Sequence, residues 1–108
     1  MQNNKDIISF IRECVESGNV YWTYRSNMRL NKRSVNRETI FKYIQTAEII
    51  EHYQQDFPLP SCLCLIYDNA GQPIHVVIAL DYADFHIRFV TVYKPDPTQW
   101  DSEFKRRI

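Results

Sequence analysis

Apolar residues in the first part of the chain recur at the spacing typical of helices. They stand at positions 7, 10, 11, 14 and 15, and Gly18 follows where a left-handed residue ends a helix. This pattern predicts a helix over residues 5–17. Residues 24–33 contain no glycine or proline and predict a second, more polar helix. Asn36 is a good N-cap, with Val35 and Ile40 in staple positions, for a third helix over about 37–45.

After residue 47 the apolar period changes from helical to alternating. The alternation predicts four strands, over residues 48–53, 61–67, 72–81 and 85–93. Short links rich in turn residues join them, so neighbouring strands should be antiparallel. Residues 20–23 predict a short extended link beneath the sheet. The expected fold is therefore α+β, with about three N-terminal helices packed on a four-stranded antiparallel sheet.

The length and composition favour a single domain over residues 1–108. A chain of 108 residues with 44% hydrophobic residues can build one core. We assign a helical half to about 5–45, a sheet half to about 48–93 and a tail to 94–108, with at most one helical turn in the tail, anchored by Trp100. The sequence shows no membrane span and no secretion signal, and an odd set of three cysteines favours reduced thiols. We therefore expect a cytoplasmic protein with no membrane contact.

Positive charge is concentrated in the first half, although the net charge is zero. Residues 1–43 carry eight Lys/Arg against four Asp/Glu, whereas residues 44–93 carry one against six. Arg25, Arg29 and Arg33 are spaced to share one side of the predicted second helix, with Lys32 and Arg37 beside it. Five basic residues without a carboxylate among them predict a site for RNA phosphates. The alternative is a solvated helix face, or arginines paired with the acidic strands.

His75 stands in an otherwise apolar strand and therefore needs a partner. If the last two strands pair symmetrically about Ala83, His75 lies opposite Thr91, with Tyr93 as its diagonal neighbour on the same face. An imidazole, a hydroxyl and a phenol in one place could move protons and position a ribose phosphate. The alternative is a hydrogen-bonded structural histidine.

A metal site and a cofactor site are both disfavoured by the residue spacing. Cys62 and Cys64 share a strand face, and His52 and His86 are further candidate ligands, but no metal-binding spacing occurs. Small core cysteines explain the same pattern. Nucleotide-binding and serine-hydrolase motifs are also missing. We predict no metal and no cofactor.

Three aromatic residues flank the basic segment. They are Tyr21, Trp22 and Tyr24. They could stack on nucleic-acid bases, or they could pack in the core.

Three motifs resemble a bacterial family known as the domain of unknown function 4258. They are P-S-C-L at 60–63, P-I-H-V-V-I-A at 73–79 and T-V-Y-K-P-D-P at 91–97, followed by Trp100. The resemblance covers about residues 20–100. That family looks like a relative of the RelE-type toxins, which have helices followed by a four-stranded antiparallel sheet. RelE-type toxins cleave RNA without a metal by using the ribose 2′-hydroxyl as the attacking group.

The resemblance implies roles for individual residues of this chain. His75, Thr91 and Tyr93 fall on the family's polar strand positions, and Arg29 and Arg33 fall on its helical arginines. Arg25 departs from the pattern, because it stands where a histidine is usual and an arginine stays protonated. A toxin would also imply an antitoxin partner.

Three hypotheses of function follow from these observations. The first is a metal-independent endoribonuclease-like domain of toxin type, with His75 as acid or base and Thr91 and Tyr93 orienting the phosphate. The second is a non-catalytic module that binds RNA or protein with the same basic helix. The third is an interaction protein whose exposed sheet edge pairs with another chain, as in a homodimer.

Overall fold

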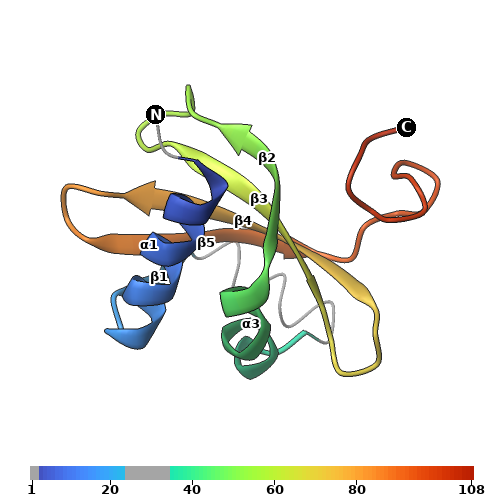
Figure 1. Cartoon of the computed structure of the whole chain (residues 1–108), viewed down its shortest axis with the longest axis horizontal. Helices are drawn as coiled ribbons and strands as arrows, with labels where there is room; N and C mark the ends of the chain where they lie inside the picture. The colour runs from blue at the N-terminus through green and yellow to red at the C-terminus, as the bar shows by residue number, and fades with distance from the viewer. Residues whose placement is uncertain (1–2, 24–34) are drawn as a thin grey trace.

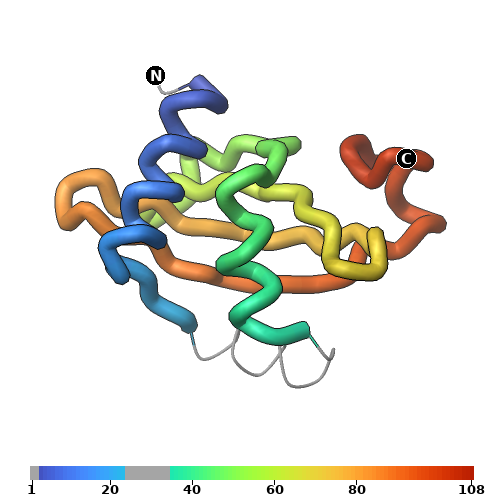
Figure 2. Tube along the Cα trace, turned by 60° about the horizontal axis from the view of Figure 1, so that its bottom comes forward, coloured from blue at the N-terminus to red at the C-terminus, as the bar shows by residue number. Residues whose placement is uncertain are grey.

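The computed structural model describes residues 3–23 and 35–108, where two α-helices lie on one side of a five-stranded sheet (Figures 1 and 2). The helices are α1 (Asn4–Glu16) and α3 (Arg37–Tyr43), and α3 continues into a 3-10 turn, η1 (Ile44–Thr46). The strands are β1 (Val20–Trp22), β2 (Glu48–Tyr53), β3 (Ser61–Tyr67), β4 (Pro73–Asp81) and β5 (His86–Tyr93). The α+β class is confirmed, whereas the predicted second helix, 24–33, lies outside the described residues.

Local capping signals fix the ends of both helices. The side chain of Asn36 accepts a hydrogen bond from the backbone N–H of Thr39 at 2.8 Å, as expected of an N-cap. Val35 and Ile40 are both buried, in agreement with the predicted staple. Gly18 has a φ of 74°, which places it in the left-handed region just after α1. Neither described helix is long and apolar enough to cross a membrane.

The prediction of a four-stranded, wholly antiparallel sheet was wrong, because Val20–Trp22 forms a fifth strand. The strand order is β1-β5-β4-β3-β2, and β1 pairs with β5 in parallel, with Val20 opposite Ile87. Trp22 stacks on Phe89 with ring centroids 4.3 Å apart. Three residues are too few to show an alternation, and the partner strand lies far along the sequence. The local pattern therefore indicated only an extended link.

The two faces of the sheet have different environments. One face packs against the helices and carries Cys62 and Cys64, which are fully buried with their Sγ atoms 3.8 Å apart. Both thiols belong to the core, as predicted. We call the opposite face, which neither described helix covers, the open face, although Leu63, Leu65 and His75 on it are buried. Its residues, assigned from strand alternation and register, include Ser61, Leu63, Leu65, His75, Val77, Ala79, His86, Arg88, Thr91 and Tyr93.

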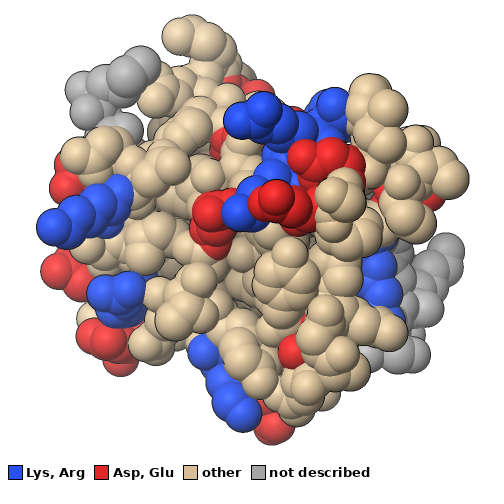
Figure 3. All heavy atoms as spheres, turned by 45° about the vertical axis from the view of Figure 1, so that its right-hand side comes forward, with Lys and Arg blue, Asp and Glu red and all other residues tan. Residues whose placement is uncertain are grey.

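The C-terminal tail, residues 94–108, folds back at the end of the sheet farthest from α1 (Figure 1). Trp100 is only 4% exposed and forms an isolated bridge with Arg107, which in turn donates hydrogen bonds to the carboxylate of Glu51. Lys105 lies 3.1 Å from the carboxylate of Glu48. Basic and acidic side chains consequently gather on this end of the molecule (Figure 3). Trp100 is the predicted anchor, but the tail contains turns and no helix.

Candidate functional site

His75, Thr91 and Tyr93 share the open face, although their pairing differs from the prediction. His75 lies opposite Tyr93, and Thr91 lies opposite Val77. The turn pairs Asp81 with His86, one residue away from symmetric pairing about Ala83, and a bulge between Val77 and Ile78 adds a second residue of shift. The Thr91 hydroxyl is buried and makes no hydrogen bond within the described part of the chain. The strands therefore bring His75 and Tyr93 into direct contact.

The ring of His75 is enclosed by Tyr93 and the tail. It is 0% exposed, with Nε2 2.8 Å from the carbonyl oxygen of Phe104 and Nδ1 3.1 Å from the hydroxyl of Tyr93. The Trp100 ring lies 4.4 Å away, edge to face. A carbonyl can only accept, so Nε2 carries the proton and Tyr93 donates to Nδ1.

Burial lowers the pKa of His75, although the Phe104 carbonyl and the charge of Glu51 act in the opposite direction. The neutral form of the ring is therefore favoured over the charged form. Both of its nitrogens have partners, which is what a structural histidine requires. While the tail is in place, a ligand has no access to it.

Four of the five predicted phosphate-binding residues lie outside the described residues. They are Arg25, Arg29, Lys32 and Arg33, and their role stays a prediction. The fifth, Arg37, begins α3, and its guanidinium lies 4.8 Å from the centre of the Trp22 ring.

The part of the open face that the tail leaves uncovered contains two adjoining hollows. The loop hollow, of about 230 Å³, is lined by Thr23, Asp56, Phe57, Pro58, Leu59, Ser61, Val77, Ala79, Arg88 and Val90. The edge hollow, of about 350 Å³, is lined by Tyr21, Trp22, Thr23, Asp84, His86 and Arg88. Thr23 and Arg88 line both hollows, so the two are parts of one site.

β1 and β5 hold the shared residues in place. The Thr23 hydroxyl donates to the carbonyl of Val90 at 3.1 Å, and its backbone N–H donates to the carbonyl of Phe89 at 3.2 Å. Tyr21 is the register partner of Arg88. The parallel pairing of β1 with β5 therefore builds this site.

Arg88 is oriented by a hydrogen bond to His86. Its Nε donates to Nε2 of His86 at 3.1 Å, so the ring proton of His86 is on Nδ1. That nitrogen is buried and lies 3.1 Å from the carboxylate of Asp84 and 3.8 Å from that of Asp81, but it makes no hydrogen bond within the described part of the chain. His86 is 5% exposed, while Arg88 is exposed. The terminal NH₂ groups of Arg88 are thus available to an anion such as a phosphate.

The same cluster offers ligand types for a metal ion, but its hydrogen bonding does not suit one. Ligand atoms of Asp81, Asp84 and His86 lie within 4.8 Å of one another. A metal on Nδ1 would place the ring proton on Nε2, where it normally donates to an acceptor. Here Arg88 Nε, itself a donor, occupies that position. The arrangement supports an arginine better than it supports a metal.

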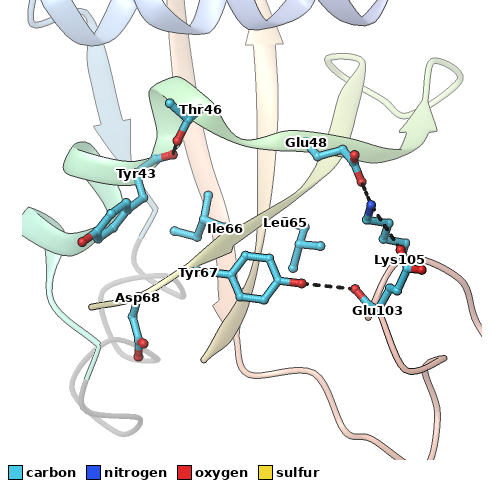
Figure 4. Close-up of a pocket in the computed structure, with 9 residues that line it drawn as sticks. All are labelled: Tyr43, Thr46, Glu48, Leu65, Ile66, Tyr67, Asp68, Glu103 and Lys105. Carbon is cyan, nitrogen blue, oxygen red and sulfur yellow. Dashed lines mark hydrogen bonds and ion pairs between the residues drawn. The ribbon is translucent and has the colours of Figure 1, made fainter. Parts of the chain in front are cut away.

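A third hollow, of about 410 Å³, lies between η1, β3 and the tail (Figure 4). Its lining includes the carboxylates of Glu48, Asp68 and Glu103 and a single amine, that of Lys105. This amine lies 3.1 Å from Glu48 and 3.4 Å from Glu103. Such a lining repels phosphates, so we do not assign it to RNA although it is the largest of the three.

Arg88 and Tyr21 are the exposed residues of this site, and the buried His86 orients Arg88. None of the three was predicted in this role. His86 was weighed only as a metal ligand, and Tyr21 as a residue for stacking or packing. Arg88 is the single basic residue between positions 44 and 93. A histidine and an arginine at alternate positions of a strand share one face, and this signal could have found the site.

Comparison with known proteins gives one match. The family of the domain of unknown function DUF4258 matches residues 22–94, which run from the end of β1 to just beyond β5. No curated protein and no solved structure matches the chain. The relationship to RelE-type toxins stays a hypothesis. Because the match spans more than half of the sequence, the chain belongs to the DUF4258 family.

Proposed function

We propose that this domain binds single-stranded RNA on the open face of its sheet. The observation that carries the proposal is the position of Arg88, an exposed guanidinium fixed by His86 between two hollows. An exposed aromatic residue lines each hollow, Tyr21 at 59% exposure and Phe57 at 94%. A cation flanked by aromatic rings is typical of proteins that hold a phosphate and stack the neighbouring bases.

The charge distribution indicates that such binding is local. Four of the thirteen basic residues lie within 24–34 and none of the thirteen acidic ones does, so the described residues carry nine basic and thirteen acidic side chains. A surface with this excess of acidic side chains is not expected to bind RNA over its whole extent. Arg25, Arg29, Lys32 and Arg33 follow soon after Thr23, which lines both hollows. We propose that these four residues bind further phosphates of the RNA whose first phosphate binds Arg88.

Replacing Arg88 with alanine is expected to weaken the binding of a fluorescent single-stranded RNA about 10-fold to 100-fold, because it removes a charge-assisted contact to phosphate. The slope of log K against log salt should fall by about 0.7, the value for one phosphate contact on a single strand. Both quantities come from anisotropy titrations at several salt concentrations.

Lys5→Ala is the matched control, since it removes one exposed positive charge from α1 on the other side of the sheet. Its affinity and salt slope should stay at the wild-type values. Equal losses in the Arg88 and Lys5 variants would mean that only net charge matters, and the proposed site would be wrong.

Cleavage of the bound RNA is a second candidate, favoured by the contact between His86 and Arg88. If a phosphate draws Arg88 away, Nε2 of His86 opens toward the edge hollow and can accept the proton of a ribose 2′-hydroxyl. The 2′-oxygen then bonds to phosphorus, the bond to the 5′-oxygen breaks, and that oxygen takes a proton from water. In this scheme His86 takes the role first given to His75.

Cleavage in the presence of a chelator should leave a 2′,3′-cyclic phosphate, and an RNA with a 2′-deoxy substitution at the cleaved position should stay intact. His86→Asn is expected to lower the rate about 100-fold or more. His75→Asn, checked for folding by circular dichroism, should retain the rate. If wild-type protein yields no cyclic phosphate, cleavage is excluded and the binding proposal stands.

Partners other than RNA stay predictions. The outer edge of the sheet at β2 carries a bulge between Ile49 and Glu51 and the charged residues Glu48 and Glu51, features that discourage pairing with a second chain. We therefore rank a homodimer through this edge, and an antitoxin partner, below RNA. A cytosolic location fits three thiols without a disulfide among them.

A further inference from the structure

The loop hollow is small and largely apolar. Val77, Ala79 and Val90 supply apolar lining from β4 and β5, and the loop between β2 and β3 supplies Phe57 and Pro58. A volume of about 230 Å³ is below the usual range for drug-sized ligands. The apolar lining and small size suit a single ring system, such as a nucleobase, better than a sugar or a peptide.

Asp56 provides the negatively charged group of this hollow. One of its carboxylate oxygens accepts a hydrogen bond from the hydroxyl of Ser61 at 2.6 Å, and its backbone N–H donates to the carbonyl of Tyr53 at 3.1 Å. Ser61 is 6% exposed, and its place in the sheet, opposite Ala79, is fixed by strand pairing. A carboxylate accepts about four hydrogen bonds, so acceptor sites remain for a ligand.

A carboxylate selects among the bases by the donors that each presents on its Watson–Crick edge. Guanine presents two adjacent donors, N1–H and the 2-amino group, which a carboxylate can accept together. Adenine and cytosine each present one amino donor beside a ring acceptor, and uracil presents one N–H between two carbonyls. An acceptor-only group therefore favours guanine.

We propose that the loop hollow binds a guanine base of single-stranded RNA through Asp56, with the adjoining phosphate on Arg88. The proposal rests on the proposed function and adds the base that the site prefers. Arg88 lines this hollow as well as the edge hollow, so a base and its phosphate can bind side by side. Phe57, exposed at the opening, is placed to stack on the base.

Labelled pentanucleotides UUGUU, UUAUU, UUCUU and UUUUU test the proposal by anisotropy. Wild-type protein is expected to bind UUGUU about 5-fold to 100-fold more tightly than the other three, the range for one bidentate contact to a base. A pentanucleotide with inosine in place of guanine lacks only the 2-amino group and should bind with intermediate affinity. This comparison needs no variant and so does not depend on the folding of one.

Asp56→Asn is expected to abolish the preference for guanine, because the amide replaces one acceptor with a donor. Glu16→Gln, which neutralises an exposed carboxylate at the end of α1, should retain it. A preference that survives Asp56→Asn would overturn the assignment to this hollow. Equal affinity for all four pentanucleotides, still lost in Arg88→Ala, would overturn the guanine proposal and keep the proposed function. No binding to any of them would overturn both.

Discussion

Trp100→Ala is expected to detach the C-terminal tail and lower the free energy of unfolding by about 3–5 kcal/mol. The indole is almost completely buried, lies edge to face against His75 and carries the guanidinium of Arg107 at 4.7 Å. The total free energy of unfolding of a small domain is only about 5–15 kcal/mol. Urea denaturation followed by circular dichroism measures the loss.

Phe57→Ala is the control for the Trp100 variant, because it also removes an aromatic ring but from a side chain that is 94% exposed. Its stability should stay within about 0.5 kcal/mol of the wild type. A Trp100→Ala protein as stable as Phe57→Ala would contradict the described packing of the tail.

The pH dependence of stability is a second measurement that should distinguish Trp100→Ala from the wild-type protein. Because the folded-state pKa of His75 is lowered, the unfolded chain binds more protons below about pH 6.5, so the free energy of unfolding should fall as the pH drops through that region. Hydrogen bonds from Arg107 and Tyr53 to the carboxylate of Glu51 outweigh its desolvation and lower its pKa. This lowered pKa adds a further loss of stability near pH 4. In Trp100→Ala, where the tail is released, the losses of stability due to His75 and to Glu51 should both become smaller.

Phe89→Ala is expected to remove about 3–5 kcal/mol and to loosen β1 from the sheet. Phe89 is fully buried, stacks on Trp22 at 4.3 Å and meets Phe41 edge to face at 5.9 Å. Its loss leaves a cavity at the place where α3, β1 and β5 meet. Urea denaturation gives the stability, and the fluorescence of Trp22 should change because its stacking partner is gone.

Phe89→Leu keeps much of the buried volume and serves as the graded control for Phe89→Ala. Its expected cost is about 1–2 kcal/mol. A cost below about 1 kcal/mol for Phe89→Ala would show that this aromatic cluster does not hold β1 in place.

Features encoded by neighbouring residues could be predicted from the sequence. The N-cap at Asn36 and the helix stop at Gly18 depend on side chains within a few positions of each other. Strands β2 and β3 begin and end where the alternation of apolar residues predicts them. Cys62 and Cys64 share a strand face because they are two residues apart, although β3 is buried on both faces.

Features that join distant segments could not be predicted. The register of the turn and the bulge in the pairing of β4 with β5 together decide that His75 meets Tyr93 rather than Thr91, and no local pattern marks either of them. The sequence showed that His75 needed a partner, but the second partner is a backbone carbonyl at residue 104, which any residue type could supply. The contact of Tyr21 with Arg88 could not be predicted, because it forms only when β1 lies beside β5.

The pairing of β1 with β5 also bears on synthesis of the protein. Val20 and Ile87 are register partners, although they stand 67 positions apart in the chain. A ribosome therefore delivers the first strand long before the strand that completes it. Pairings between distant segments form slowly, and unpaired strands are prone to aggregate in the meantime. The first strand of the nascent chain therefore stays unpaired until almost the whole domain has emerged from the ribosome. Arg88 and Tyr21 come together only when β5 pairs with β1.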